Sequence, residues 1–205
     1  MSLLPRQLVL VGAVVLGTLL PSAARAQSQE MATPGPFPHT PDAAACATEA
    51  MTVEDVLAAL VAPAATPAVA TPDAVVAAGK AADAATADAV KATLLQVFAC
   101  ANAGDPLRFA NLYTDAFLRD FFDGVPQADL EAFLGMAPQP LPAEQQRIIR
   151  GVGDVEILPE GRARVVIILD EPDDPRTEEP DTVILRQVDG RWLVDEIHED
   201  AAESQ

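Results

Sequence analysis

The second half of the chain has a helical hydrophobic pattern that is followed by strand-like patterns. The first predicted helix can be capped by Asp83 or Thr86, and it ends at Gly104, after which Asp105 and Pro106 start another helix. Its apolar residues recur at the spacing of one buried helix face; these are Val90, Leu94, Val97, Phe98 and Ala101. A further short helix is predicted over Ala128–Met136.

Four strands are predicted after the prolines at 138, 140 and 142. They are Arg147–Leu158, Arg162–Asp170, Thr182–Val188 and Arg191–Ile197, and the last two flank Asp189 and Gly190, a strong hairpin signal. The second strand is apolar on both faces, which predicts a central strand that is covered on both sides. Helices followed by an antiparallel meander indicate the α+β class.

The second helical stretch holds five of the nine aromatic residues within a span of 14 positions. Phe109, Tyr113, Phe117 and Phe121 are spaced four apart, and Phe122 adds to them. Such a stripe at helical spacing is typical of a core, although it can also line a ligand pocket, because aromatic rings dominate both kinds of buried surface.

The first 26 residues have the pattern of a cleavable signal peptide. Arg6 precedes the apolar run Leu8–Leu20, and small residues lead to a cleavage site before Gln27. The run is shorter than the ~20 residues of a membrane-spanning helix. We therefore expect an exported protein, secreted or extracytoplasmic, with no membrane attachment after cleavage.

Three segments with little predicted regular structure flank the predicted domain, which covers residues 83–199. Residues 27–45 are rich in proline and predict a disordered or extended lead-in. Residues 46–82 predict an arm that has a short helix capped by Thr52, with Asp55 in its first turn, and then a linker rich in Ala, Pro and Thr. Residues 200–205 form a tail.

Charge and cysteine content narrow the function classes. The chain has 13 Lys and Arg against 31 Asp and Glu, which gives a formal charge of −18 and argues against nucleic acid as a partner. Cys46 and Cys100 are the two cysteines, and in an exported protein they predict one disulfide. Metal binding would need more ligands nearby, so no metal or cofactor is expected.

The segment Cys100–Asp105, the helices of Leu107–Phe122 and the closing Val188–Val194 strand resemble a nuclear transport factor 2-like domain of the SnoaL and ketosteroid isomerase-like group. The matching motifs are Asn-x-Gly-Asp at the helix break and Gly-x-Trp at the last strand. The resemblance covers residues 83–199 and implies a cystatin-like cone, in which helices pack inside a strongly bent antiparallel sheet. It also implies a pocket at the open end and frequent dimers, among both enzymes and proteins without chemistry.

Isomerase-like chemistry would need a pocket carboxylate as base and a phenol that donates to the oxyanion. Tyr113 is the single tyrosine, and Asp115 and Asp120 are the nearest acids. The isomerase-like pattern places its donor tyrosine on the first helix, whereas Tyr113 lies on the second. Helix capping and core packing explain Tyr113 and Asp115, so no catalytic residue is assigned.

The remaining candidates are weaker. His39 and His198 are expected to be solvated. The acidic loop from Asp170 to Asp181 has carboxylates that suit calcium, but its prolines interrupt any ligand spacing, so a solvated hairpin tip is expected.

We therefore expect an exported, non-catalytic domain that binds a small apolar ligand or a partner protein and can form a homodimer. Its candidate pocket residues are Phe98, Tyr113, Phe117 and Trp192. The alternatives are an isomerase- or dehydratase-like enzyme that uses a pocket acid, and a structural or interaction protein whose cone is filled by its own side chains.

Overall fold

A computed structural model describes residues 38–62, 79–170, 172 and 180–199. The chain divides into two compact units, Met1–Glu30 and Met31–Gln205, and all the described residues belong to the second. The predicted signal peptide, most of the linker, most of the acidic loop and the tail lie outside the described residues.

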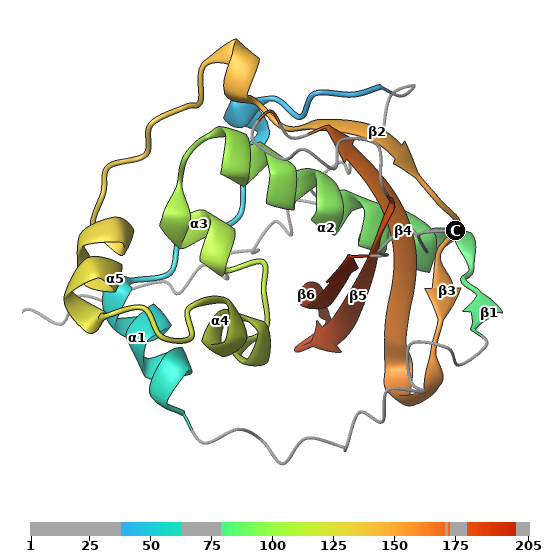
Figure 1. The fold of residues 1–205 in the computed structure, drawn as a ribbon. Coiled ribbons are helices and arrows are strands. Elements are labelled where there is room, and N and C mark those ends of the chain that lie inside the picture. The colour runs from blue at the N-terminus through green and yellow to red at the C-terminus, as the bar shows by residue number, and fades with distance from the viewer. Residues whose placement is uncertain (1–37, 63–78, 171, 173–179, 200–205) are drawn as a thin grey trace, which may run out of the picture. The chain divides into compact units, whose positions relative to one another are not determined.

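The described residues form five α-helices and an antiparallel sheet, which confirms the α+β class (Figure 1). The helices are α1 (Val53–Val61), α2 (Ala84–Asn102), α3 (Pro106–Ala110), α4 (Asp115–Phe121) and α5 (Gln127–Leu134). Short 3-10 turns lie at Ala43–Ala45, Ala143–Gln145 and Pro159–Gly161.

Polar side chains start four of these helices, as the sequence predicts for three of them. Thr52 and Asp55 form a capping box at α1, and Asp83 accepts a hydrogen bond from the Thr86 backbone at α2. Asp105 caps α3 with Pro106 in its first turn. Thr114 caps α4, so the chain turns twice between α2 and α4.

The sheet has six strands, with β4 at its centre. The strands are β1 (Lys80–Ala81), β2 (Ile148–Val152), β3 (Glu156–Ile157), β4 (Arg162–Asp170), β5 (Pro180–Val188) and β6 (Arg191–Glu199). The order is β1-β3-β4-β5-β6, with β2 also paired to β4, and all these pairs are antiparallel. The predicted meander is therefore confirmed.

The β5–β6 hairpin turns at Asp189 and Gly190, whose φ angles of 50° and 79° are left-handed. Asparagine, aspartate and glycine tolerate these angles best, which is why this pair was a reliable signal. Two strand predictions need correction. Residues 147–158 form two strands rather than one, with Gly153 between them, and β4 is not covered on both faces, because Val166 is exposed.

The core lies between α2 and one face of the sheet. Val90, Leu94 and Val97 of α2 belong to the same buried cluster as Val165 and Leu185 of the sheet. Among the described residues, α2 is the one helix long and apolar enough to cross a membrane by length and composition, and its large apolar residues Val90, Leu94, Val97 and Phe98 are buried in this core.

The predicted disulfide is present. The sulfur atoms of Cys46 and Cys100 lie 2.04 Å apart, and the two residues are 54 positions apart in the chain. The bond ties the segment before α1 to the buried end of α2, where Cys100 is fully enclosed.

The described part of the lead-in, residues 38–45, which the sequence predicts to be disordered or extended, contains a bridge to the sheet and a 3-10 turn. His39 pairs through its backbone with Ile149 of β2 at 2.8 Å in both directions. The carbonyl of buried Pro41 accepts a hydrogen bond from the Asn102 side chain at 3.0 Å. Partners distant in sequence supply the hydrogen bonds that order this segment, and composition does not reveal them.

Candidate functional site: an aromatic row

Six aromatic rings form a continuous chain of contacts, which we call the aromatic row. Its members, in order of contact, are Phe109, Tyr113, Phe117, Phe121, Phe122 and Phe133. The centroids of Tyr113 and Phe117 are 4.5 Å apart, those of Phe117 and Phe121 are 5.8 Å apart, and both pairs are stacked. These distances lie in the range of favourable ring pairing.

Exposure increases from Tyr113 to Phe121 within the aromatic row, while Phe109 and Phe122 are half-buried. Tyr113 is buried at 6% exposure, Phe117 is half-buried, and Phe121 is 56% exposed. Phe133, at the far end, is 41% exposed. The row therefore connects the core to the surface, and the expectation that the whole stripe is core is wrong for Phe121.

The buried ring of the row, Tyr113, lies at a break between two helices, and we call this buried part of the row its inner end. The backbone of residues 112–114 leaves α3 and runs beside β6, where Thr114 donates to the Val194 carbonyl and Val194 donates to the Leu112 carbonyl, both at 2.9 Å. Tyr113 lies between these two hydrogen bonds in a parallel bridge to Val194. The predicted stripe is thus divided between α3 and α4, although its rings still stack.

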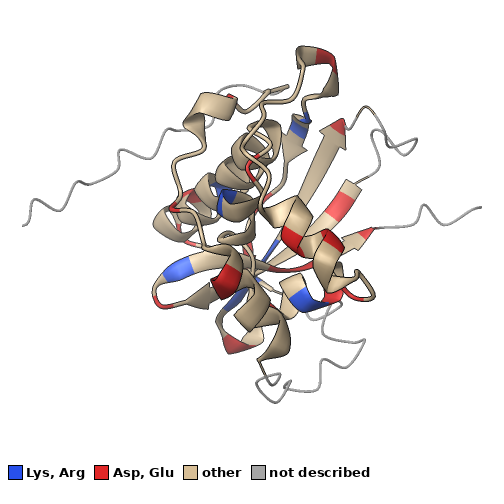
Figure 2. Ribbon diagram, turned by 90° about the vertical axis from the view of Figure 1, so that its left-hand side faces the viewer, with Lys and Arg blue, Asp and Glu red and all other residues tan. Residues whose placement is uncertain are grey.

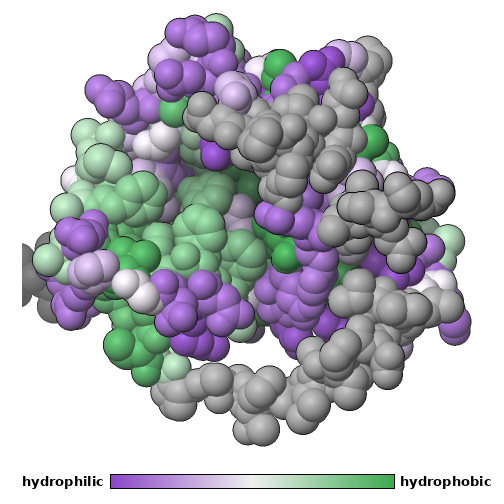
Figure 3. All heavy atoms as spheres, viewed as in Figure 1, coloured by the Kyte–Doolittle hydropathy of each residue, from purple (hydrophilic) through white to green (hydrophobic). Residues whose placement is uncertain are grey.

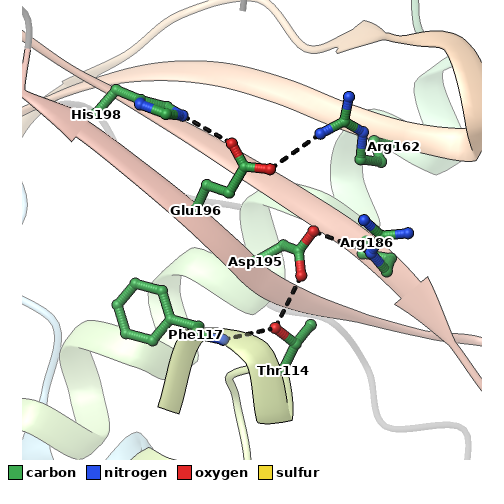
Figure 4. Close-up of polar contacts among 7 residues, drawn as sticks. All are labelled: Thr114, Phe117, Arg162, Arg186, Asp195, Glu196 and His198. Carbon is green, nitrogen blue, oxygen red and sulfur yellow. Dashed lines mark hydrogen bonds and ion pairs between the residues drawn. The ribbon is translucent and has the colours of Figure 1, made fainter. Parts of the chain in front are cut away.

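A buried polar contact fixes the start of α4 against β6 (Figure 4). The Thr114 hydroxyl donates to Asp195 Oδ1 at 2.8 Å and accepts from the Phe117 backbone N–H at 3.2 Å. Asp195 Oδ2 accepts from Arg186 Nε at 2.9 Å. Asp195 is buried at a bulge in β6. Through Thr114, it connects the start of α4, and with it Phe117, to the sheet.

A second polar group lies beside this contact on the sheet. Glu196 accepts from Arg162 Nη1 at 3.0 Å and lies 2.8 Å from His198 Nε2 (Figure 4). Arg162 is buried, and its ion pair with Glu196 offsets the cost of burying its charge. His198, expected to be solvated, has a carboxylate partner.

The four predicted pocket residues all belong to the core or pack against it, and among them Tyr113 and Phe117 stack on each other. Phe98 and Tyr113 are buried in the core cluster, and Phe117 and Trp192 are partly buried against it. The Trp192 carbonyl also accepts a hydrogen bond from Thr93 of α2 at 3.3 Å. Figure 3 shows a hollow in one face of the molecule, with hydrophobic residues gathered along one side of it.

The acid candidates of an enzyme lie elsewhere. Asp115 and Asp120 are exposed on α4, and Asp115 occupies the first turn after the Thr114 cap, as capping predicts. The acid that lies near the aromatic row is Asp195, which contacts Thr114 at the start of α4, and the sequence did not predict it. A single aspartate inside a strand carries no sequence signal for a contact with Thr114, 81 positions away.

No group of three or more His, Cys, Asp or Glu residues that could hold a metal ion occurs in the described part of the chain. Asp170, at the start of the acidic loop, forms an ion pair with Arg150. Most of the loop lies outside the described residues, so calcium binding there stays untested.

None of the family models, curated proteins or solved structures compared with the chain matches it. The resemblance to nuclear transport factor 2-like domains therefore stays a prediction, and function has to be argued from the geometry of the aromatic row.

Proposed function

We propose that this protein is a non-catalytic binding domain that holds a small apolar ligand against the aromatic row. In this proposal the helices and sheet form the cone of a nuclear transport factor 2-like domain, and the hollow of Figure 3 is its open end. Phe117 and Phe121 would supply the wall that the ligand contacts, with Tyr113 behind them.

The observation that carries the proposal is the increase in exposure from Tyr113 through Phe117 to Phe121, three rings that stack one on the next. Rings that served only the core would all be buried, because exposing an aromatic side chain gives up the free energy of its transfer from water. Phe121 instead remains 56% exposed while it stacks on Phe117 at 5.8 Å. A ligand that covered Phe121 would recover that free energy.

The environment of Asp195 supports binding rather than chemistry. A general base needs a carboxylate lone pair that can reach a substrate proton. Asp195 is 8% exposed, and each of its oxygens accepts a hydrogen bond, from Thr114 and from Arg186, so little access to the remaining lone pairs is left for a substrate. Asp195 is therefore better suited to position the row than to accept a proton.

The disulfide supports export, which is the second part of the proposal. Disulfides persist in oxidising compartments and are rare in reducing ones. The Cys46–Cys100 bond is thus compatible with the predicted signal peptide.

A neutral naphthylamine fluorophore tests the proposal, because its emission rises when it enters an apolar site. We expect saturable binding to the wild-type protein, and about tenfold weaker binding to the Phe117→Ala and Phe121→Ala variants. Val166→Ala removes a side chain of similar exposure on β4 and serves as the control that keeps wild-type affinity. Absence of saturable binding, or equal affinity in all four proteins, would refute the proposal.

A further inference from the structure

The outer end of the aromatic row continues into an exposed apolar surface, which we call the outer patch. It consists of Phe121, Val125, Phe133 and Met136, which are 56%, 42%, 41% and 54% exposed. These four are half of the eight large hydrophobic residues that are exposed among the described residues. Exposed apolar side chains scattered singly need no explanation, but a group on adjacent helices is typical of an interaction site.

The members of the outer patch are linked by contacts. Phe121 meets Phe122 at 4.9 Å, and Phe122 meets Phe133 of α5 at 6.2 Å between ring centroids. The Val125 backbone bonds to the Phe122 carbonyl at 3.1 Å. These ring contacts join Phe121 to Phe133 through Phe122, and Val125 and Met136 lie in the short segments that follow α4 and α5.

Acidic residues surround the outer patch in the sequence. Residues 115–136 carry five acids and one base, and the five acids are all exposed; they are Asp115, Asp120, Asp123, Asp129 and Glu131. The one base, Arg119, is engaged with the Ala59 carbonyl at 3.1 Å. Figure 2 turns the side of α1 and α5 toward the viewer, and acidic residues outnumber basic ones there.

We propose that the outer patch docks a cationic amphipathic segment of a partner protein. The apolar face of such a segment would cover Phe121 and Phe133, and its Lys or Arg side chains would meet the surrounding acids. This inference goes beyond the proposed function, because it assigns a macromolecular partner to the outer surface rather than a small ligand to the hollow.

The negative charge around the outer patch favours a cationic partner over two other occupants, a second copy of the chain and an anionic membrane surface. A second copy of the chain would bring the same acids against these ones, and the whole chain has a formal charge of −18. An anionic membrane surface would be repelled for the same reason. A cationic partner gains from the charges that oppose both of the others.

The experiment uses the purified protein and a fluorescein-labelled synthetic helix of Leu and Lys with one apolar face, followed by fluorescence anisotropy. A matched helix in which Glu replaces every Lys is the ligand control. We expect the Lys helix to bind and the Glu helix to bind at least about tenfold more weakly. We also expect the affinity for the Lys helix to fall as salt rises from about 50 mM to about 500 mM.

Two double variants separate the apolar and the charged contributions. Phe133→Ser with Met136→Ser, which leaves Phe121 in place, should weaken binding by about tenfold or more, whereas Val166→Ser with Val188→Ser, exposed on the strands, should not. Asp120→Asn with Asp123→Asn should lower the affinity and flatten the salt dependence. The matched pair Glu144→Gln with Asp154→Asn, also exposed, should leave both unchanged.

Three outcomes would overturn this inference: equal binding of the Lys and Glu helices, unchanged binding by the Phe133 and Met136 double variant, or a protein dimer that those two substitutions dissociate. The last result, seen by light scattering, would identify a second copy as the occupant. Naphthylamine binding to the hollow is read separately. A wild-type protein that binds naphthylamine but not the Lys helix refutes only this inference, and one that binds the Lys helix but not naphthylamine refutes only the proposed function.

Discussion

The two ends of the aromatic row are made of the same kind of side chain but differ in what surrounds them. Tyr113, at the inner end, is buried and is flanked by backbone hydrogen bonds to β6. Phe121 and Phe133, at the outer end, face solvent on α4 and α5. Folding explains the inner end, because burial there removes apolar area from water. It does not explain the outer end, which is why we assign that end to binding.

The largest effect is expected at the inner end, where Tyr113→Ala would leave a cavity among Phe109, Phe117 and the sheet. Its free energy of unfolding should fall by about 3–5 kcal/mol, as for other buried aromatic residues replaced by alanine. Urea unfolding followed by circular dichroism measures this. A loss below about 1 kcal/mol would show that the two ends do not differ as described.

The disulfide should have an effect of similar size on the same region. Replacing both Cys46 and Cys100 by alanine removes a crosslink over 54 positions, which the chain-entropy model values at ~4 kcal/mol. Reducing the disulfide of the wild-type protein should lower its melting temperature as much as the double alanine substitution does. If the outer patch is independent of this crosslink, the variant should still bind the Lys helix at temperatures where it is folded.

The helix starts, the last hairpin and the disulfide could be predicted from the sequence, because each depends on the chemistry of a few neighbouring residues or on a single possible pairing. The capping residues Thr52, Asp83 and Asp105 announce their helices through hydrogen bonds only a few residues long. The Asp189–Gly190 turn needs left-handed backbone angles that few residues tolerate. The two cysteines, once export is inferred, leave a single pairing.

The support of the row could not be predicted, because it depends on contacts between distant segments. Asp195 meets Thr114 only after β6 and the start of α4 have come together, and nothing near Asp195 in the sequence marks that contact. Phe121 has the same four-residue spacing as Tyr113, but spacing alone does not show where the neighbouring elements end. The two-residue strand β1 was missed for the same reason, since its pairing with β3 is remote.

A moderate effect is expected where the inner end is anchored to the sheet. Asp195→Asn weakens the contacts with Thr114 and Arg186, and we expect a loss of about 1–3 kcal/mol in unfolding free energy together with weaker naphthylamine binding. Asp115→Asn, one residue beyond the Thr114 cap and exposed, is the control and should cost less than about 1 kcal/mol. Equal losses in the two variants would contradict the anchoring role of Asp195.

The smallest effect concerns the exposed caps of α1 and α2. Hydrogen bonds from the Thr52 side chain and backbone lower the pKa of Asp55 below its usual 3.8. The Thr86 backbone N–H, and then its side chain, lower the pKa of Asp83 in the same way. A carboxylate with a lowered pKa stabilises the fold above pH 3.8 and loses that contribution as pH falls through the folded-state pKa.

Melting temperatures measured from about pH 6 to about pH 2 should therefore fall more steeply for the wild-type protein than for a variant with Asp55→Asn and Asp83→Asn. Asparagine can still cap a helix but does not titrate. Parallel curves would show that these two caps do not contribute to the acid sensitivity of the protein.

The central claim is that the outer end of the aromatic row is kept for binding, and the Phe121→Ala variant tests it most directly. Naphthylamine affinity and unfolding free energy are measured on the same sample. We expect the affinity to fall about tenfold while the unfolding free energy changes by less than about 1 kcal/mol. An unchanged affinity, with a stability loss of about 3 kcal/mol as for a buried ring, would show that Phe121 belongs to the core and would contradict the claim.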